Sequence, residues 1–322
     1  MKPNWPCTMI PIVFLLASCG GDSGDSTQPA PILTPSPTPT PAPAPSPTPT
    51  PSSPTYLSAS DFSRDRSFSG IGLRIGVDRS NGTAVTDVRL DPEGTAIGFD
   101  FTASSRTYVA RYNSDTITAV TQGVATEPPY DKFSGPNSSF SRSPFALAAS
   151  ATGVLIGSTY FGYVDWSDNN GTGAGDFGTR SATRRILFGA RTVMSDLPTS
   201  SVAAFMGQST MTGPGGGSGG TASITVDYAA RTIAGATVFS PASTGGTGSS
   251  GGPAPTPEPI TFSGTLDPST GRLTGVITHT ASGATGKFEG ALYGPHGVEI
   301  AMVFTMSAAD GTRYSGLIGG RN

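Results

Sequence analysis

Residues Ala222-Ser-Ile-Thr-Val-Asp-Tyr228 alternate strictly between apolar and polar, and the apolar side chains share one face: Ala222, Ile224, Val226 and Tyr228. Glu299–Ser307 likewise places the apolar residues Ile300, Met302, Phe304 and Met306 on one face. A period of two is typical of a β-strand with one buried face. These two segments therefore predict that the C-terminal part of the chain is built from β-strands.

Working outward from these segments, short turns separate further strand-like runs. The predicted strands are Val202–Thr210, Ala222–Tyr228, Thr232–Ser240, Ile260–Leu266, Arg272–Thr280, Thr285–Tyr293, Glu299–Ser307 and Arg313–Gly319. Eight antiparallel strands with short connections favour a closed barrel, which leaves no exposed sheet edge. We expect a soluble eight-stranded barrel over 196–322. A membrane-spanning barrel is the alternative, but the chain has few aromatic residues to form girdles.

The region before the barrel, 56–195, also has a β pattern. Its clearest strand-like runs are Thr95–Thr102, Arg106–Arg111, Gly153–Val164 and Arg185–Arg191. The chain holds 44 Gly and 29 Pro, which disfavours long helices. We therefore predict an all-β protein in which a β-sheet handle domain, 56–195, precedes the barrel.

The N-terminus has the pattern of an exported protein. Lys2 precedes the apolar run Met9–Leu16, which is too short to span a bilayer as a helix. The following Leu16-Ala-Ser-Cys19 resembles the lipobox of bacterial lipoproteins, which implies a signal peptide over 1–18 and acylation of Cys19. An ordinary secretory signal with a chance cysteine is the alternative. The residue after the cysteine is Gly20 and not Asp, and by resemblance to the sorting rule of enteric bacteria this favours transport to the outer membrane.

Residues 19–55 are predicted to be a disordered linker between the lipidated cysteine and the β region. Nearly every second residue of Pro29–Pro54 is Pro, which favours an extended polyproline II backbone. At about 3.1 Å per residue, this segment can reach about 80 Å. It suits a spacer that holds the β region away from a membrane.

Two C-terminal segments resemble transferrin-binding protein B and its relatives. Gly286-Lys-Phe-Glu-Gly-Ala-Leu-Tyr-Gly-Pro-His-Gly-Val-Glu-Ile300 is similar to the family stretch G-x-F-x-G-x-F-Y-G-P-x-A-x-E-I/L-G-G. Ser315–Arg321 is similar to the family's terminal G-A/V-x-x-G-K/R. The chain departs from the family pattern at three places. Leu292 replaces the usual aromatic residue, Gly297 replaces the usual Ala, and Ala301-Met302 replaces the usual Gly-Gly.

Upstream, Phe188–Thr192 and Leu197–Ser200 resemble the family segment that opens the barrel, and Tyr163–Trp166 lies where the family has a Y-x-x-x-G-x-W strand. The resemblance implies a surface lipoprotein with one handle and one barrel. It does not carry over transferrin recognition, because the family's recognition loops match no residues here.

The sequence indicates no catalytic residues, no metal site and no cofactor, and we expect no enzyme. The G-x-S-x-G matches at Ser218 and Ser250 lie in glycine-rich stretches, without the following helix of a hydrolase. His279 and His296 are more typical of surface or turn positions than of ligands. Asp165–Asp176 leaves an irregular calcium site open, although the EF-hand spacing fails.

The function predicted is that of an outer-membrane lipoprotein, anchored by its lipid and displayed at the cell surface, that binds a protein noncovalently. A role in iron or nutrient acquisition is one form of this prediction. The alternative is a structural or accessory lipoprotein that partners an outer-membrane protein and has no diffusible ligand. A weaker hypothesis is capture of a haem or metal carrier in a cleft between handle and barrel. A net charge of −3 without a basic run excludes nucleic acid as an expected partner.

Binding is expected at loops at one barrel end and on the adjoining handle. The candidate loops are Gly213–Gly220 and Thr244–Glu258, but their glycine content equally suits passive, disordered connections, and we favour the passive interpretation for both.

Overall fold

A computed structural model describes residues 55–59, 61–78, 84–120, 131–134, 138–149, 155–169, 180–213, 216–239 and 259–322. All of them belong to one compact unit, Ser52–Asn322. The predicted signal peptide, Cys19 and the tether lie outside the described residues. No helix in the described ranges has the length and apolar character needed to cross a membrane.

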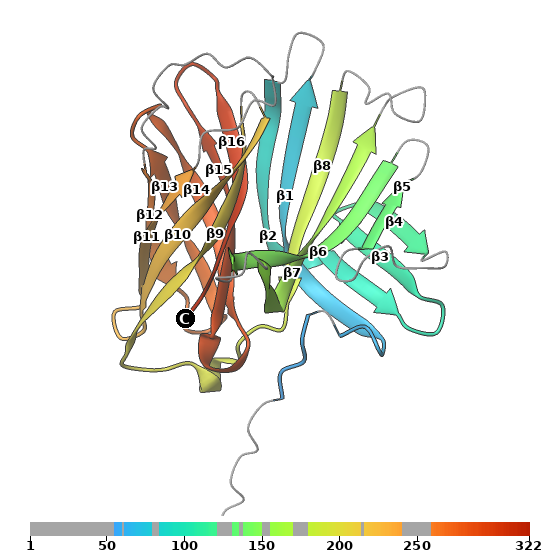
Figure 1. Cartoon of the computed structure of the whole chain (residues 1–322), viewed down its shortest axis with the longest axis horizontal. Helices are drawn as coiled ribbons and strands as arrows, with labels where there is room; N and C mark the ends of the chain where they lie inside the picture. The colour runs from blue at the N-terminus through green and yellow to red at the C-terminus, as the bar shows by residue number, and fades with distance from the viewer. Residues whose placement is uncertain are drawn as a thin grey trace, which may run out of the picture. The chain divides into compact units, whose positions relative to one another are not determined.

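The first half of the unit is an open antiparallel sheet of eight strands in the order β4-β3-β2-β1-β8-β7-β6-β5 (Figure 1). The strands are β1 (Arg66–Asp78), β2 (Ala84–Thr102), β3 (Thr107–Tyr112), β4 (Asp115–Val120), β5 (Asp131–Ser134), β6 (Ser138–Ala149), β7 (Leu155–Asn169) and β8 (Arg180–Gly189). One face buries a cluster of aromatic rings, in which Phe99 is stacked on Tyr108 and tilted against Phe188. This sheet is the predicted handle.

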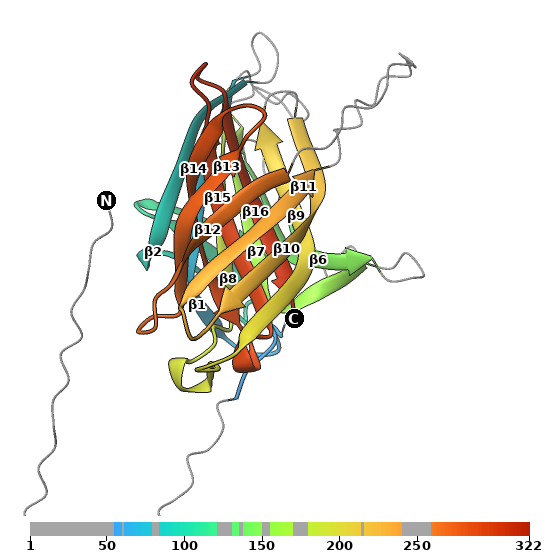
Figure 2. The same ribbon diagram turned by 90° about the vertical axis from the view of Figure 1, so that its left-hand side faces the viewer.

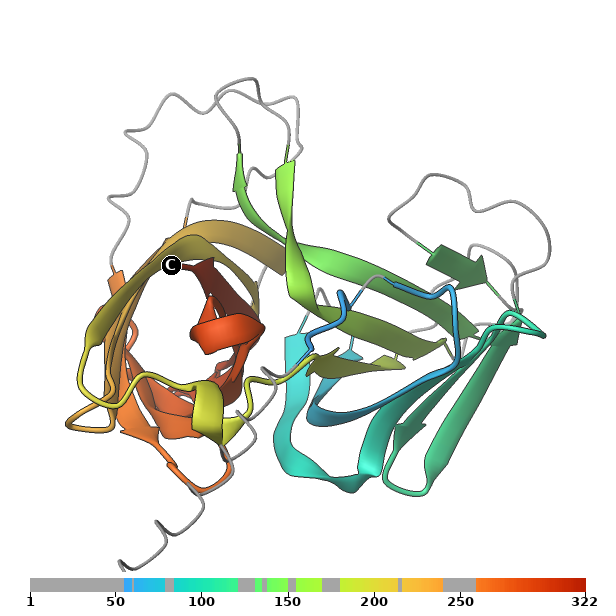
Figure 3. The same cartoon turned by 90° about the horizontal axis from the view of Figure 1, so that it is seen from below.

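The second half is a closed antiparallel barrel, seen as a ring in Figure 3. Its strands are β9 (Val202–Gly213), β10 (Gly216–Asp227), β11 (Thr232–Phe239), β12 (Pro259–Leu266), β13 (Arg272–His279), β14 (Ala284–Tyr293), β15 (Glu299–Ser307) and β16 (Arg313–Arg321). Two 3-10 turns, η1 (Met194–Asp196) and η2 (Pro295–Gly297), lie in its connections. The predicted all-β class and the eight-stranded barrel are confirmed.

Apolar side chains fill the barrel, and the alternation that predicted the strands places them there. Ile224, Val226, Met302 and Phe304 all belong to the interior cluster and are at most 1% exposed. On β10 the side chains between them, Ser223 and Thr225, face solvent. This is the reverse of a membrane-spanning barrel, whose apolar band faces outward.

The narrow interior of the barrel accommodates phenylalanine rings because a glycine lies opposite each of three of them. Gly235 pairs with Phe262, Gly275 with Phe288 and Gly316 with Phe304 across neighbouring strands. A Cβ added to any of these glycines would lie within 2.5–2.6 Å of the opposing ring. Small and large residues therefore alternate so that each ring lies over bare backbone.

The sheet and the barrel share a packed core. Ile71, Leu73 and Phe161 of the sheet cluster with Tyr293 and Val303 on the outer side of the barrel. As a result, β15 is buried on both faces along most of its length. The predicted boundary at 195/196 falls in the connection between β8 and β9, and it stays a prediction.

The structure corrects one predicted loop. Gly213–Gly220 was a candidate loop, with a passive connection as the favoured interpretation, but Gly213 ends β9 and Gly216–Gly220 belong to β10. The two strands pair from Gly216↔Gly213 through Gly220↔Ser209, so the ladder extends through the glycine-rich run. Glycine weakens a strand without preventing one, because its backbone still donates and accepts ladder hydrogen bonds.

Candidate functional site

Strands β9–β13 are neighbours in the barrel, and in Figure 2 this side of the barrel faces the viewer. Most of the side chains on its outer face are short and uncharged. The strand register places them in four rows across the barrel. The rows are Gln208-Thr221-Val238-Pro259, Met206-Ser223-Ala236-Thr261-Thr278, Ala204-Thr225-Ala234-Ser263-Val276 and Val202-Asp227-Thr232-Thr265-Thr274. We call this surface the neutral face.

Charge is confined to the edge of the neutral face. Among the described outward positions of β9–β13, the only charged side chains are Asp227 and Arg272, each at the end of its strand. Asp227 accepts a hydrogen bond from the N–H of Ala230 at 2.8 Å, and Arg272 pairs with Glu289 of β14. Both charged side chains therefore already have a partner close by.

Several apolar side chains are exposed on this face. Met206 is 66% exposed, Val202 63% and Val276 57%, which makes them the most exposed large apolar residues described. With strands about 4.8 Å apart and rows about 6.8 Å apart, the neutral face covers roughly 600 Å². A typical stable interface buries about 800 Å² on each partner, so the face is large enough to form most of one.

Burying this face costs little compared with burying an ordinary surface. Lys, Arg, Gln and Glu lose about 1.5–2 kcal/mol of side-chain entropy when they are immobilised, whereas Ala loses none. Charged side chains must also lose their hydration. The neutral face has few long or charged side chains. It can therefore be covered by a partner at low entropic and desolvation cost.

A polar cluster at one end of the barrel ties the start of the described chain to it. Tyr56 donates a hydrogen bond to Asp196 at 2.9 Å, and the N–H of His296 donates to the same carboxylate oxygen at 2.9 Å. The hydrogen bond from His296 is the main cause that lowers the pKa of Asp196. Val193 N–H donates to the hydroxyl of Tyr56 at 3.0 Å. The cluster therefore has a structural role, because its polar groups are engaged in these hydrogen bonds.

The structure places some of the residues singled out in the sequence and leaves others outside its described ranges. Asp165 to Asn169 lie in β7, where Asp165 pairs with Arg185 at 2.7 Å, while 170–176, the second half of the possible calcium loop, lie outside the described residues. Ser218 lies within β10 and not at a strand-to-helix turn. Among the described residues, no group of three or more His, Cys, Asp and Glu side chains could hold a metal ion.

Ser250 and the candidate loop Thr244–Glu258 are also outside the described residues. His279 is the last residue of β13, and its Nδ1 lies 2.8 Å from the hydroxyl of Ser282. His296 lies in η2, and its Nδ1 lies 3.0 Å from the carboxylate of Asp196.

Sequence reasoning missed the neutral face. Its signal was present, because 202–226, 232–257 and 259–266 contain no Asp, Glu, Lys or Arg. The significance of that absence depends on barrel closure, which brings the outward halves of five strands onto one surface.

The arrangement described above is that of an all-β protein built from one open sheet and one closed barrel. Among solved structures, the chain is similar to transferrin binding protein B from Neisseria meningitidis serogroup B, with 11% identity over 80% of this chain and 77% of that one and a TM-score of 0.36. It is also similar to HpuA from Kingella denitrificans, solved in complex with human haemoglobin, with 11% identity, coverage of 84% and 91%, and a TM-score of 0.38.

A third similar structure is a protein of unknown function from Nostoc punctiforme, with 7% identity, coverage of 80% and 95%, and a TM-score of 0.27. Transferrin binding protein B is the family that the sequence resemblance indicated. At these TM-scores and identities, nothing about a ligand follows from the similarity. No known family model matches the chain, and no curated protein matches it by sequence.

Proposed function

We propose that this chain is an outer-membrane lipoprotein, anchored through lipid on Cys19 and displayed at the cell surface, that binds a protein ligand noncovalently. The neutral face is the observation that carries the proposal. It combines exposed apolar side chains, hydroxyls and an absence of charge on a rigid barrel. A scarcity of charged side chains is typical of the core of a protein interface.

The partner is a protein that presents an uncharged patch. A charged partner surface would lose hydration on this face without gaining an ion pair. The hydroxyls of Thr225 and Ser263, near the centre of the lattice, can donate to or accept from a partner's backbone groups. The sequence resemblance to the transferrin-binding protein B family favours a role in iron or nutrient acquisition.

The second candidate function is that of an accessory lipoprotein whose partner is an outer-membrane protein. The same face supports it, because a surface without charge also suits a permanent interface. The two functions differ in whether the partner is diffusible. Loops at the barrel end remain a further predicted contact region.

The anchor and the display are tested by protease shaving of intact cells. We expect shaving to remove the β region of the wild type, and Cys19→Ala to release or mislocalise the protein. Survival of the β region until the outer membrane is broken would contradict surface display.

The neutral face is tested by placing a photo-crosslinking residue at Ser263 or, as a control, at the exposed Ser104 in the turn between β2 and β3. We expect one discrete crosslinked partner from Ser263 alone, and its loss when Thr225→Arg introduces a charge two strands away in the same row. A partner that comes from the medium supports ligand capture, and one that comes from the outer membrane supports the accessory role. Equal crosslinking from both positions, or none from Ser263, would contradict the proposal.

A further inference from the structure

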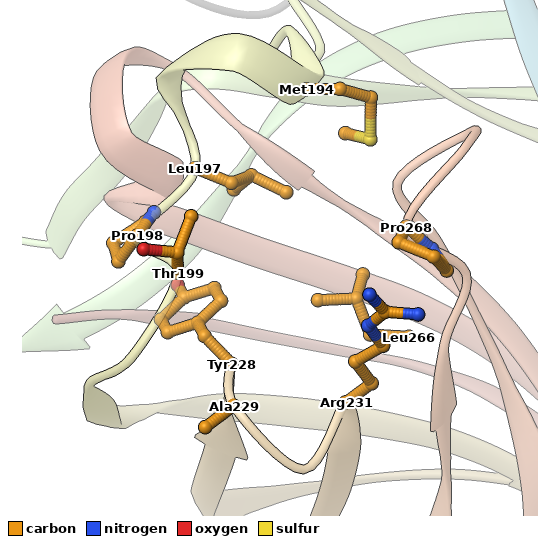
Figure 4. Close-up of a pocket in the computed structure, with 9 residues that line it drawn as sticks. All are labelled: Met194, Leu197, Pro198, Thr199, Tyr228, Ala229, Arg231, Leu266 and Pro268. Carbon is orange, nitrogen blue, oxygen red and sulfur yellow. The ribbon is translucent and has the colours of Figure 1, made fainter. Parts of the chain in front are cut away.

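A cavity of about 230 Å³ lies at the end of the barrel that η1 covers. Three connections that are far apart in the sequence supply its walls, with Met194 and Leu197 from the first, Tyr228 and Arg231 from the second, and Leu266 and Pro268 at the third (Figure 4). An apolar cavity of about 150 Å³ is enough to bind benzene. This cavity therefore has room for a small molecule of one ring or a short branched chain.

The ring of Tyr228 forms part of the wall, and its hydroxyl is buried near Gly297. Tyr228 lines the cavity and is only 5% exposed, and within the described part of the chain its hydroxyl has no hydrogen-bond partner. A buried tyrosine hydroxyl usually has a partner, and leaving it without one costs about 1–3 kcal/mol. Burial also raises the pKa of Tyr228 to about 12, so the group remains a donor at neutral pH.

The cavity also has a free cation at its rim. Arg231 is exposed, and its guanidinium makes no ion pair or hydrogen bond with the described residues. The N–H of Leu266 donates to the carbonyl of Arg231 at 2.9 Å, which fixes this turn beside the cavity. The carboxylates nearest along the chain are occupied, because Asp227 accepts from Ala230 and Asp267 accepts from Ser269.

We propose that this cavity binds a small carboxylic acid with an apolar body. The body packs between Leu197, Leu266 and the ring of Tyr228, and the carboxylate pairs with Arg231. A planar guanidinium recognises a carboxylate through two parallel hydrogen bonds. The site is separate from the neutral face, so this inference does not depend on the proposed function.

Two sources share this chemistry, namely a free organic acid and the C-terminal residue of a peptide. Benzoate represents the first source, and N-acetylphenylalanine represents the second. Benzyl alcohol and N-acetylphenylalanine amide are the uncharged counterparts. A preference for one acid over the other identifies the source, and binding of either acid in preference to its uncharged counterpart supports the proposal.

Binding is measured by ligand-observed NMR titration on the full chain carrying Cys19→Ala, so that no detergent competes for the cavity. We expect benzoate to bind at least about tenfold more tightly than benzyl alcohol, a difference of about 1.4 kcal/mol. Arg231→Gln should remove that preference and leave benzyl alcohol binding unchanged, which also shows that the cavity is intact. Leu197→Trp should fill the cavity and weaken binding of both probes.

Arg106→Gln is the matched control, because Arg106 is also an exposed arginine in a strand connection with a positive φ, 50° against 58° for Arg231. It should leave both affinities unchanged. The proposal is overturned if the acids bind no better than their uncharged counterparts or if neither acid binds. It is also overturned if Arg106→Gln weakens benzoate as much as Arg231→Gln does.

Discussion

Gly275 of β13 and Phe288 of β14 lie directly opposite each other inside the barrel, and a Cβ added to Gly275 would lie 2.6 Å from Cε1 of the phenylalanine ring. The added atom would also lie 2.2 Å from the carbonyl oxygen of Ser263. The ring and the neighbouring backbone of β12 together occupy the space that any other residue at 275 would need. Inside the barrel, glycine is therefore required at such positions because no side chain would fit there.

Gly275→Ala is therefore expected to destabilise the protein by about 1–3 kcal/mol, the usual range for overpacking a core. Unfolding in urea followed by circular dichroism measures this change. Phe288→Leu should cost stability alone but relieve part of the effect of Gly275→Ala, so the double variant should be less than additive.

Gly217→Ala is the control for that prediction. Gly217 also lies in a barrel strand, but the nearest atom to its added Cβ is 3.7 Å away, an ordinary contact. We expect this variant to be neutral or slightly stabilising. Equal losses at 217 and 275 would show that strand flexibility, and not the Phe288 ring, sets the requirement for glycine.

A second prediction concerns Glu299, which links the barrel to the sheet. Glu299 is fully buried and accepts hydrogen bonds from the N–H groups of Thr159 and Tyr160, each at 2.8 Å, while pairing with Arg321. Glu299→Ala should cost about 3–5 kcal/mol, because it leaves a cation and two amides without their partner. Thermal unfolding monitored by calorimetry provides the measurement.

The exposed pair of Arg74 and Asp87 is the comparison for Glu299. Its atoms are 3.5 Å apart, and both side chains are more than 40% exposed. Asp87→Ala should change stability by less than about 1 kcal/mol. If the two losses are similar, the buried network does not stabilise the junction.

A third prediction follows from Asp267 in the β12–β13 turn. The hydroxyl and the N–H of Ser269 donate to it at 2.7 and 2.8 Å, and these bonds hold its pKa at about 2, below the ordinary value of 3.8. Because the folded value is the lower one, the stabilisation is complete above about pH 4 and is lost as the pH falls toward 2. Asp267→Asn should be less stable than wild type at neutral pH and equally stable near pH 2.

The pH dependence of that difference is the test. Urea midpoints of the two proteins, measured in steps from neutral pH to pH 2, should converge only below about pH 4. Convergence at higher pH, or a constant difference throughout, would mean that the Ser269 hydrogen bonds do not lower the pKa of Asp267.

How well each part could be predicted from the sequence depended on how its strands are buried. The barrel strand Ala222–Tyr228 alternates because one face meets the interior and the other meets solvent. The sheet strand β1 was missed because it is buried on both faces, with Phe68 in the aromatic cluster and Ile71 against the barrel. Its glycines also interrupt the apolar run, so the segment shows neither the alternation of a half-buried strand nor the continuous apolar run of a fully buried one.

The two candidate sites could not be read from local patterns for a related reason. Arg231 and Leu197 are separated by a whole barrel hairpin and meet only because the barrel closes. The neutral face likewise combines five strands, each of which looks like an ordinary half-buried strand by itself. Register and closure, which depend on long-range pairing, decide what these residues form together.

The last prediction concerns the boundary at 195/196. If the barrel were an independent domain, 196–322 alone would be as stable as it is in Ser52–Asn322. The outer sides of β14–β16 argue against this, because Tyr293, Val303 and Leu317 are at most 1% exposed and pack on the sheet. Without the sheet these side chains would meet water, at a cost of about 25 cal/mol for each Å² of apolar surface.

The isolated fragment 196–322 should therefore bind a hydrophobic dye and self-associate in analytical ultracentrifugation, whereas Ser52–Asn322 should do neither. Val303→Thr together with Leu317→Thr should reduce dye binding by the fragment, because both changes make the exposed side more polar. The same pair should destabilise Ser52–Asn322, where the two side chains are buried. A monomeric fragment that unfolds cooperatively at the midpoint of the longer chain would instead establish 195/196 as a true domain boundary, and would mean that the shared core contributes little to the barrel.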